Sequence, residues 1–272
     1  MNYLKGIFLT TSILSIVVFS ACEKNGELLN FSLEDDIELG VLLDTEIQSN
    51  PEVYPILSRT QYAAAYAMLD GILSQILESD SVVNKEGFTW AIHILDDDRT
   101  INAFTVPGGS LYLYTGMIFL LDREDDLAGL IGHQVAHIDQ RHSSKRLQLE
   151  FGIPNLLSIV NQERPEVTSD VSTFLASPGL LEFTREEERE ADIYTVEYLS
   201  DTEYACNGAA TFFEKVLARE QSGVDIPFLN AHIRSDDKVA DINTIANAVG
   251  CNTNHADADG SRMDALQALL RN

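Results

Sequence analysis

The chain has 272 residues, 45% of them hydrophobic, which is enough for a sizeable core in one large domain or two small ones. It contains 18 Lys and Arg residues against 43 Asp and Glu, so its formal net charge at pH 7 is −25. That charge argues against nucleic acid as a partner and against docking on anionic lipid by charge alone.

The first 21 residues are predicted to be a lipoprotein signal peptide. A lysine is followed by an apolar run, and small residues precede Cys22 in the sequence FSAC. The polar Glu23 comes next, and the whole pattern resembles a bacterial lipobox, in which the cysteine carries the lipid. An ordinary signal peptide with a chance cysteine is the alternative. A membrane-spanning helix is disfavoured, because polar residues interrupt the short apolar run.

Residues 22–31 are expected to be a polar tether, and residues 32–272 a single domain. A lipid on Cys22 would hold that domain at a membrane of the bacterial cell envelope, facing the periplasm or the cell surface. The first helix is expected to begin at Ser32, which can cap an acidic first turn. A second is expected over residues 62–77, where apolar residues recur at helical spacing.

Two strands are expected next, joined through a turn at residues 107–109. The first alternates around Trp90, Ile92 and Ile94, and the second is formed by Leu111, Tyr112, Leu113 and Tyr114. The turn and the alternation suggest that the second strand is an edge strand, to which a peptide could add by main-chain hydrogen bonds. A fully paired interior strand is the alternative. One small strand group in a mostly helical chain predicts an α+β domain.

A pair of histidines stands on the first helix predicted after Arg123. His133 and His137 are four residues apart, so their imidazoles share one helix face, as in half of a zinc site. In the His-Glu-x-x-His motif a glutamate follows the first histidine, but here that position is Gln134. The pair alone is weak evidence, since a polar helix can carry such a spacing by chance.

A third ligand is expected in the later helix that begins after Thr184. Glu188 can donate an oxygen to zinc. Asp192, four residues on, can hydrogen-bond the ring nitrogen of a ligand histidine that does not face the metal. The neighbouring acids Glu186, Glu187 and Glu190 are expected to be solvated. His142 lies five residues after His137 and is expected to face elsewhere, and the metzincin pattern is absent.

Two cysteines remain when Cys22 is set aside. Cys206 and Cys251 are expected to form a disulfide, because exported proteins commonly pair such residues. Two buried free thiols are the alternative.

Four blocks together resemble the HtpX/BepA-like and CaaX-endopeptidase-like zinc metallopeptidases, which are gluzincins. The blocks are NAFTVPGGSLYLYTGMI, LAGLIGHQVAHIDQRH, FTREEEREAD and FLNAHIRSDDKV. The resemblance implies a zincin-type domain that cuts polypeptides in the cell envelope as part of protein quality control. It implies that His133, His137 and Glu188 bind zinc and that His232 lies near the metal. It also implies that Asp192 hydrogen-bonds a zinc-binding histidine.

The sequence departs from the family pattern at three places. Gln134 replaces the catalytic glutamate, Ala231 and Ile233 flank His232 where Thr and Pro are expected, and Lys238 replaces an arginine. A carboxamide cannot accept the proton of the attacking water, and loss of a general base typically slows a reaction by ~10²- to 10⁴-fold.

Four interpretations follow from these departures. The chain is a natural zinc-binding pseudoprotease that acts as a chaperone or scaffold, a peptidase that uses another base or zinc-hydroxide chemistry alone and whose hydrolysis is strongly impaired, or a laboratory-inactivated form of an active enzyme. A helical lipoprotein without metal is the fourth.

Overall fold

The computed structural model describes residues 31–177, 181–232 and 237–271. The predicted signal peptide, Cys22 and the tether up to residue 30 lie outside the described residues. The first helix begins as predicted: the Ser32 side chain accepts a hydrogen bond from the Asp35 amide, and the Asp35 carboxylate accepts one from the Ser32 amide. This reciprocal capping box satisfies two amides that the helix itself leaves free.

The described residues form a mostly helical chain with three short strands. In order, the elements are α1 (Leu33–Gln48), α2 (Ala63–Glu78), β1 (Ala91–Leu95), β2 (Ala103–Val106), β3 (Ser110–Tyr114), α3 (Thr115–Leu120), α4 (Glu124–Asp139), α5 (His142–Phe151), α6 (Ile153–Val160), α7 (Glu166–Ala176), α8 (Arg185–Ser200), α9 (Gly208–Gln221), α10 (Pro227–Ala231), α11 (Lys238–Val249) and α12 (Ser261–Leu270). This confirms the predicted fold class. No described helix is both long and apolar enough to cross a membrane.

The strand order corrects one expectation from the sequence. The sheet runs β1-β3-β2, so β3 is the central strand, parallel to β1 and antiparallel to β2. Both edges of the strand formed by Leu111, Tyr112, Leu113 and Tyr114 are therefore paired by the protein itself. A peptide cannot add to this strand, and the prediction that it is the substrate-binding edge is wrong. The Pro107-Gly108-Gly109 turn leads from β2, an edge strand, into the middle of the sheet.

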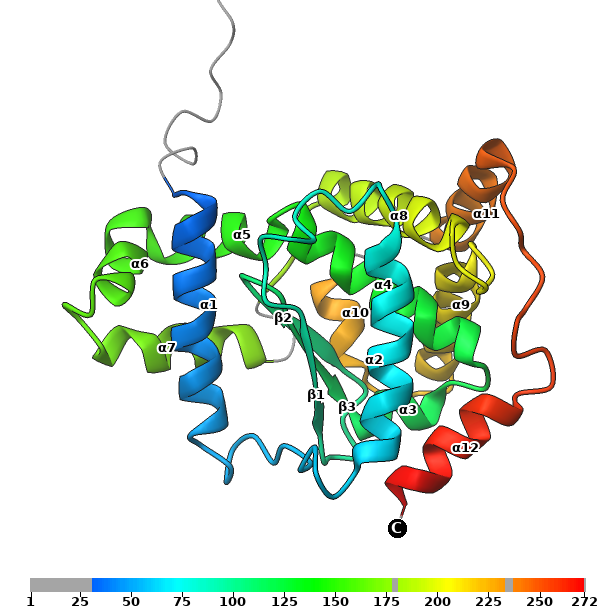
Figure 1. Cartoon of the computed structure of the whole chain (residues 1–272), viewed down its shortest axis with the longest axis horizontal. Coiled ribbons are helices and arrows are strands. Elements are labelled where there is room, and N and C mark those ends of the chain that lie inside the picture. Colours follow the sequence, from blue (N-terminus) through cyan, green and yellow to red (C-terminus); the bar gives the residue numbers. More distant parts are fainter. Residues whose placement is uncertain (1–30, 178–180, 233–236, 272) are drawn as a thin grey trace, which may run out of the picture.

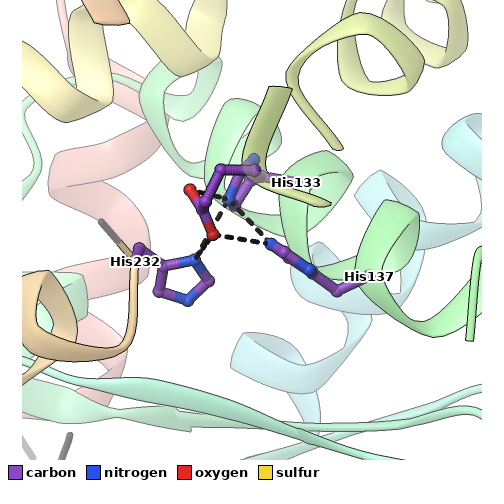
Figure 2. A group of neighbouring side chains, drawn as sticks. His133, His137 and His232 are labelled. Carbon is purple, nitrogen blue, oxygen red and sulfur yellow. Dashed lines mark hydrogen bonds and ion pairs between the residues drawn. The ribbon is translucent and has the colours of Figure 1, made fainter. Parts of the chain in front are cut away.

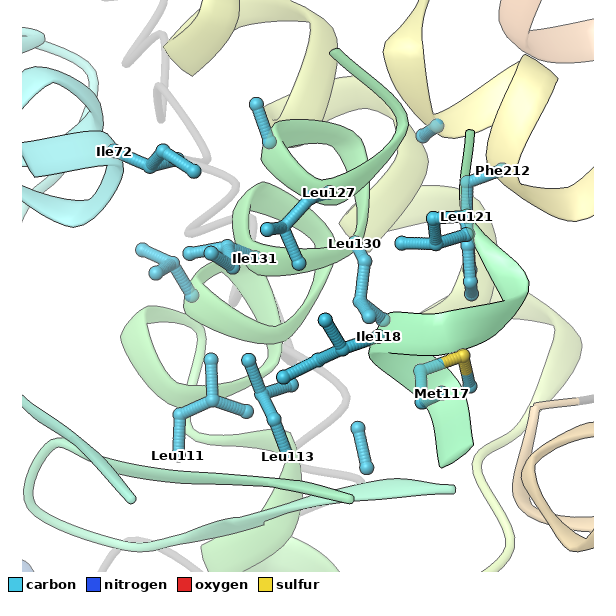
Figure 3. Packing of buried hydrophobic residues seen from close by; sticks show 14 of the residues in the cluster. Ile72, Leu111, Leu113, Met117, Ile118, Leu121, Leu127, Leu130, Ile131 and Phe212 are labelled. Atoms are coloured by element: carbon cyan, nitrogen blue, oxygen red, sulfur yellow. The ribbon is translucent and has the colours of Figure 1, made fainter. Parts of the chain in front are cut away.

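The sheet separates two hydrophobic clusters, because successive strand side chains point to opposite faces. Leu111 and Leu113 face a core built from α2, α3, α4, α8, α9, α10, α11 and α12. Tyr112 and Phe104 face a second cluster with α1, α5, α6 and α7. Figure 1 shows these two groups of helices on either side of the sheet. Figure 3 shows the first core, where Leu127, Leu130 and Ile131 of α4 lie over the strand residues.

Helix α4 is the central element of the first core, and every one of its residues is buried. It packs against α8 and α9. At the crossing with α9, Gly129 meets Gly208 so closely that a Cβ on Gly129 would lie 2.2 Å from the Gly208 carbonyl carbon. Cys206, just before α9, is joined by a disulfide to Cys251, with Cα atoms 6.2 Å apart. This is the pairing predicted from the sequence.

Candidate metal centre

Two buried helices bring the candidate ligands together. Helix α4 carries His133 and His137 on one face, one turn apart, and α8 carries Glu188. The start of α8 is fixed by a capping box in which Thr184 and Glu187 exchange side-chain-to-backbone hydrogen bonds. Glu188 is therefore held on the first turn of α8. His232 joins from the residue that follows α10, and Figure 2 shows the three imidazoles converging.

The donor atoms of these four residues face one another. His133 Nε2 lies 3.1 Å from His137 Nε2 and 3.2 Å from His232 Nδ1. The Glu188 carboxylate lies 2.8 Å from His232 Nδ1, 3.2 Å from His137 Nε2 and 3.6 Å from His133 Nε2. One ligand atom from each residue can be chosen so that all four lie within 4.8 Å of one another.

These separations fit a tetrahedral metal ion. Zinc binds imidazole nitrogen and carboxylate oxygen at about 2.0–2.2 Å, which places the ligand atoms of a tetrahedron about 3.3 Å apart. Hydrogen bonding alone does not explain the cluster. A neutral imidazole nitrogen carries at most one hydrogen, but His133 Nε2 faces two other ring nitrogens and a carboxylate.

Burial and charge favour the ligand forms of His137, His232 and Glu188. His133 and His137 are fully buried, Glu188 is 4% exposed and His232 is 2% exposed. Burial lowers the pKa of His232 and holds that of His137 well below its usual value, which favours the neutral imidazole. Burial and the charge of Lys238 also act to lower the pKa of His133, but Asp192 and Glu188 outweigh them and raise it. Burial alone would raise the pKa of Glu188, but opposing contributions, of which the charge of Lys238 is the largest, hold that pKa well below its usual value.

Comparison with known proteins agrees with this geometry. The model of peptidase family M48 matches residues 66–246, a segment that contains all four donors. The chain belongs to peptidase family M48. M48 metallopeptidases are zinc-dependent.

Relatives in this family are metallopeptidases. A mitochondrial metalloendopeptidase OMA1 of Schizosaccharomyces pombe is 30% identical over 155 residues, which cover 56% of this chain and 45% of the relative. A β-barrel assembly-enhancing protease of Yersinia pestis is 23% identical over 88% of this chain and 52% of its own length. Its counterpart in Escherichia coli K12 is 24% identical over 57% of this chain and 34% of its own length. The chain thus spans about half the length of these relatives or less.

Gln134 lies beside the candidate metal centre. Its side-chain nitrogen is 3.2 Å from His232 Nε2, and the residue is only 1% exposed. Gln134 and His232 line a cavity of about 10 Å³ together with residues 102–105 of β2 and its approach. This volume has room for about one water molecule. The strand beside the candidate metal centre is therefore β2. The predicted strand β3 is the next strand in the sheet.

A lysine stands between the two acids of α8. Lys238 is 5% exposed, and its Nζ lies 2.7 Å from Glu188 and 2.9 Å from Asp192. Asp192 Oδ1 is 3.2 Å from His133 Nδ1, as expected for an acid behind a ligand, although the two atoms are not aligned for a hydrogen bond. The sequence indicated the position of Lys238 only as a departure from the family pattern. Its contact with both acids was not predicted.

The sequence also did not predict the contacts of His142 with His137 and with Glu190, whose Oε2 lies 3.1 Å from His142 Nε2. The sequence predicted that His142 faces away from His137, but its Nδ1 lies 3.0 Å from His137 Nδ1. The reason is a break in the helix: Arg141 adopts a left-handed conformation with φ of 60°, so α5 starts afresh at His142 and turns the ring back. A non-glycine residue gives no local signal for that conformation.

Proposed function

We propose that this M48 chain is a zinc-binding, lipid-anchored metalloendopeptidase-family protein that acts on polypeptides in the bacterial cell envelope, with hydrolysis strongly impaired by Gln134. The observation that carries the proposal is the convergence of His133, His137, Glu188 and His232 at the separations of a tetrahedral site.

Zinc is the proposed ion because of the chemistry of the donor set. Three imidazoles and one carboxylate suit zinc, whereas magnesium and calcium prefer oxygen ligands. His133, His137 and Glu188 would hold the ion, as the family resemblance implies. When bound, zinc lowers the pKa of water to about 7 and polarises a carbonyl oxygen.

His232 makes a fourth donor and therefore has two roles in this proposal. With His232 at the ion, all four tetrahedral positions are filled by protein, whereas catalytic zinc sites keep one position open. Substrate would have to displace this side chain. Once displaced, His232 could stabilise a developing oxyanion or pass on a proton, since its imidazole is then free on both nitrogens.

Gln134 limits the reaction. Peptide hydrolysis needs an acceptor for a proton of the attacking water and later a donor to the leaving amine. A carboxylate performs both steps, and the carboxamide of Gln134 performs neither. We expect hydrolysis to be ~10²- to 10⁴-fold slower than with glutamate at this position.

Polypeptide would bind along β2 in this proposal. Among the described residues, β2 pairs with β3 on one side only, and residues 102–105 border the cavity beside Gln134 and His232. All four residues of β2 are buried, so an extended peptide could pair with the other side of β2 only by displacing the side chains that cover it.

The second candidate is a pseudoprotease that binds zinc and polypeptide as a chaperone or scaffold. Two observations favour it: the replacement of the base by Gln134, and a cavity of only about 10 Å³ beside it. A laboratory substitution in an active enzyme would leave the same residue at this position.

Anchoring rests on the sequence around Cys22. The lipobox-like FSAC supports a lipid on that cysteine, and relatives named as β-barrel assembly-enhancing proteases support a place in the envelope. Mass spectrometry of the N-terminal peptide should show an acylated Cys22, and Cys22→Ser should release the protein from membranes. An unmodified Cys22 in membrane-extracted protein would contradict the anchor.

The catalytic part is tested by Gln134→Glu, assayed on an unfolded protein with and without chelator. Gain of chelator-sensitive hydrolysis supports an M48 peptidase scaffold that lacks only its base. A matched variant, His133→Ala with Gln134→Glu, should stay inactive. If Gln134→Glu is inactive while zinc and peptide still bind, the pseudoprotease is the better description.

A further inference from the structure

The two ligand histidines of α4 are supported differently on the side away from the ion. His133 Nδ1 lies near Asp192 but is not aligned with it, and the same carboxylate is bound by Lys238. His137 Nδ1 instead lies 3.0 Å from the Nδ1 of His142. His142 has no exposed side-chain surface, and its Nε2 lies 3.1 Å from Glu190 Oε2.

The hydrogens along this second path can be assigned from one end to the other. His137 Nε2 faces the other donors of the site, so the hydrogen of its neutral ring belongs on Nδ1. That hydrogen is donated to His142 Nδ1, which must then accept. The hydrogen of His142 therefore sits on Nε2 and is donated to the Glu190 carboxylate. Each polar atom on the path has one partner of the right kind.

We infer that His142 and Glu190 are a positioning pair, which fixes the tautomer and the ring orientation of His137 so that its Nε2 is presented to the metal. This inference rests on the proposed zinc binding. Partners of this kind behind a ligand histidine typically change metal affinity by ~10- to 100-fold when removed. Neither residue touches substrate or the reacting atoms.

The fold supports this assignment at both residues. The left-handed Arg141 ends α4 and starts α5 at His142, which directs the imidazole back onto His137. Phe183 stacks on the other side of the His137 ring, with centroids 3.9 Å apart and an interplanar angle of 21°. The His137 ring thus contacts Phe183 through its face and His142 through its edge.

Glu190 offers the sharper test because its side chain is 43% exposed, so its removal should leave the fold intact. Glu186, also on α8, is exposed and makes no side-chain hydrogen bond or ion pair among the described residues, which makes Glu186→Ala a matched control for charge. Glu190→Gln keeps an oxygen that accepts from His142 and removes only the charge.

The measurement is a zinc competition titration of the full protein with a chelator of known affinity, together with the visible spectrum of the cobalt-substituted form. Glu190→Ala should weaken zinc binding ~10-fold and shift the cobalt bands. The loss of zinc affinity in His142→Phe should be at least as large. Glu186→Ala and Glu190→Gln should match the unmodified protein, and the thermal midpoint of metal-free Glu190→Ala should not move.

Two results would overturn the inference. One is equal zinc affinity and an equal cobalt spectrum in Glu190→Ala and Glu186→Ala. The other is an equal loss in Glu190→Gln and Glu190→Ala, which would make the effect one of charge instead of position. If the unmodified protein binds no zinc, the proposed function itself fails, and that result is distinguishable from both.

Discussion

The two ends of helix α4 bury polar side chains in opposite ways. At its start, Asp125 is fully buried and accepts hydrogen bonds from the backbone amides of Ala205, Ala256 and Asp257 at 2.8, 3.0 and 2.9 Å. Asp257 repeats the arrangement and accepts from the amides of Glu124 and Met263, each at 3.0 Å. These bonds join α4 to the segments before α9 and α12.

At the other end, the buried polar atoms face atoms like themselves. His133 and His137 present ring nitrogens to each other and to His232, and Asp192 leaves an oxygen without an aligned partner. Both ends are equally buried, so burial alone does not mark a functional site. A buried polar group with complete partners joins parts of the fold. A buried group of converging acceptors requires a cation to complete it.

The largest expected difference between the two ends is in metal binding, and His137→Ala tests it. Removing one donor should weaken zinc binding more than ~100-fold, which is the upper limit typical of removing a residue that only hydrogen-bonds a metal ligand. Stability of the metal-free protein should also fall, because the variant leaves a cavity beside Phe183 and removes the partner of His142, so the titration is made on variant protein shown to be folded. Isothermal titration with zinc measures the effect, and retained tight binding would show that the ion uses other residues.

Asp125→Ala should do the reverse. It strips three backbone amides of their acceptor, and the free energy of unfolding should fall by about 3 kcal/mol or more, given that each unsatisfied buried group costs about 1–3 kcal/mol. Zinc affinity should stay within twofold. Urea unfolding and zinc titration of the same sample check both statements. A large loss of zinc affinity in a folded variant would mean that the two ends are coupled.

The disulfide lies near the start of α4, so its loss, like that of Asp125, should lower stability without changing zinc binding. Replacing both cysteines, Cys206→Ser with Cys251→Ser, opens a loop closed across a sequence separation of 45 residues. The free energy of unfolding should fall by about 2–4 kcal/mol through the larger freedom of the unfolded chain. Zinc stoichiometry should not change. Unreduced, alkylated protein that shows two free thiols by mass spectrometry would contradict the bond itself.

Asp192→Asn should give the smallest effect of the series. The amide keeps an oxygen toward Lys238 but loses the charge behind His133, so zinc should bind ~10-fold more weakly. Glu190→Gln, which changes charge in the same way on the same helix, is the control and should bind normally. An unchanged affinity in Asp192→Asn would remove Asp192 from the support of the site.

Local signals were sufficient for the ligands but not for what surrounds them. The i, i+4 spacing identified His133 and His137, and Thr184 marked the start of the helix that carries Glu188, because helix geometry and capping act over a few residues. The central place of β3 depends on pairing between distant strands, and its own alternation is the same at an edge or in the middle.

The contacts of His142, Asp125, Asp257 and Lys238 could not be predicted, because they depend on how separate segments pack together. The helices α5, α6 and α7 were not assigned, and their absence hid the turn that returns His142 to the site. Asp125 and Asp257 resemble solvated acids in the sequence, since the amides that cover them come from segments up to 133 residues away. The charge of buried Lys238 is balanced by two acids of α8, and its Nζ also lies 4.3 Å from the centre of the Phe213 ring.

The most direct test of the whole account is the metal content of the unmodified protein. Native mass spectrometry of purified, folded chain should show one zinc ion per molecule, and a chelator should remove it and lower the thermal midpoint. Zinc added back should restore both. A folded protein that carries no metal, and whose thermal midpoint does not respond to zinc, would contradict the claim that the converging histidines and Glu188 are a metal site.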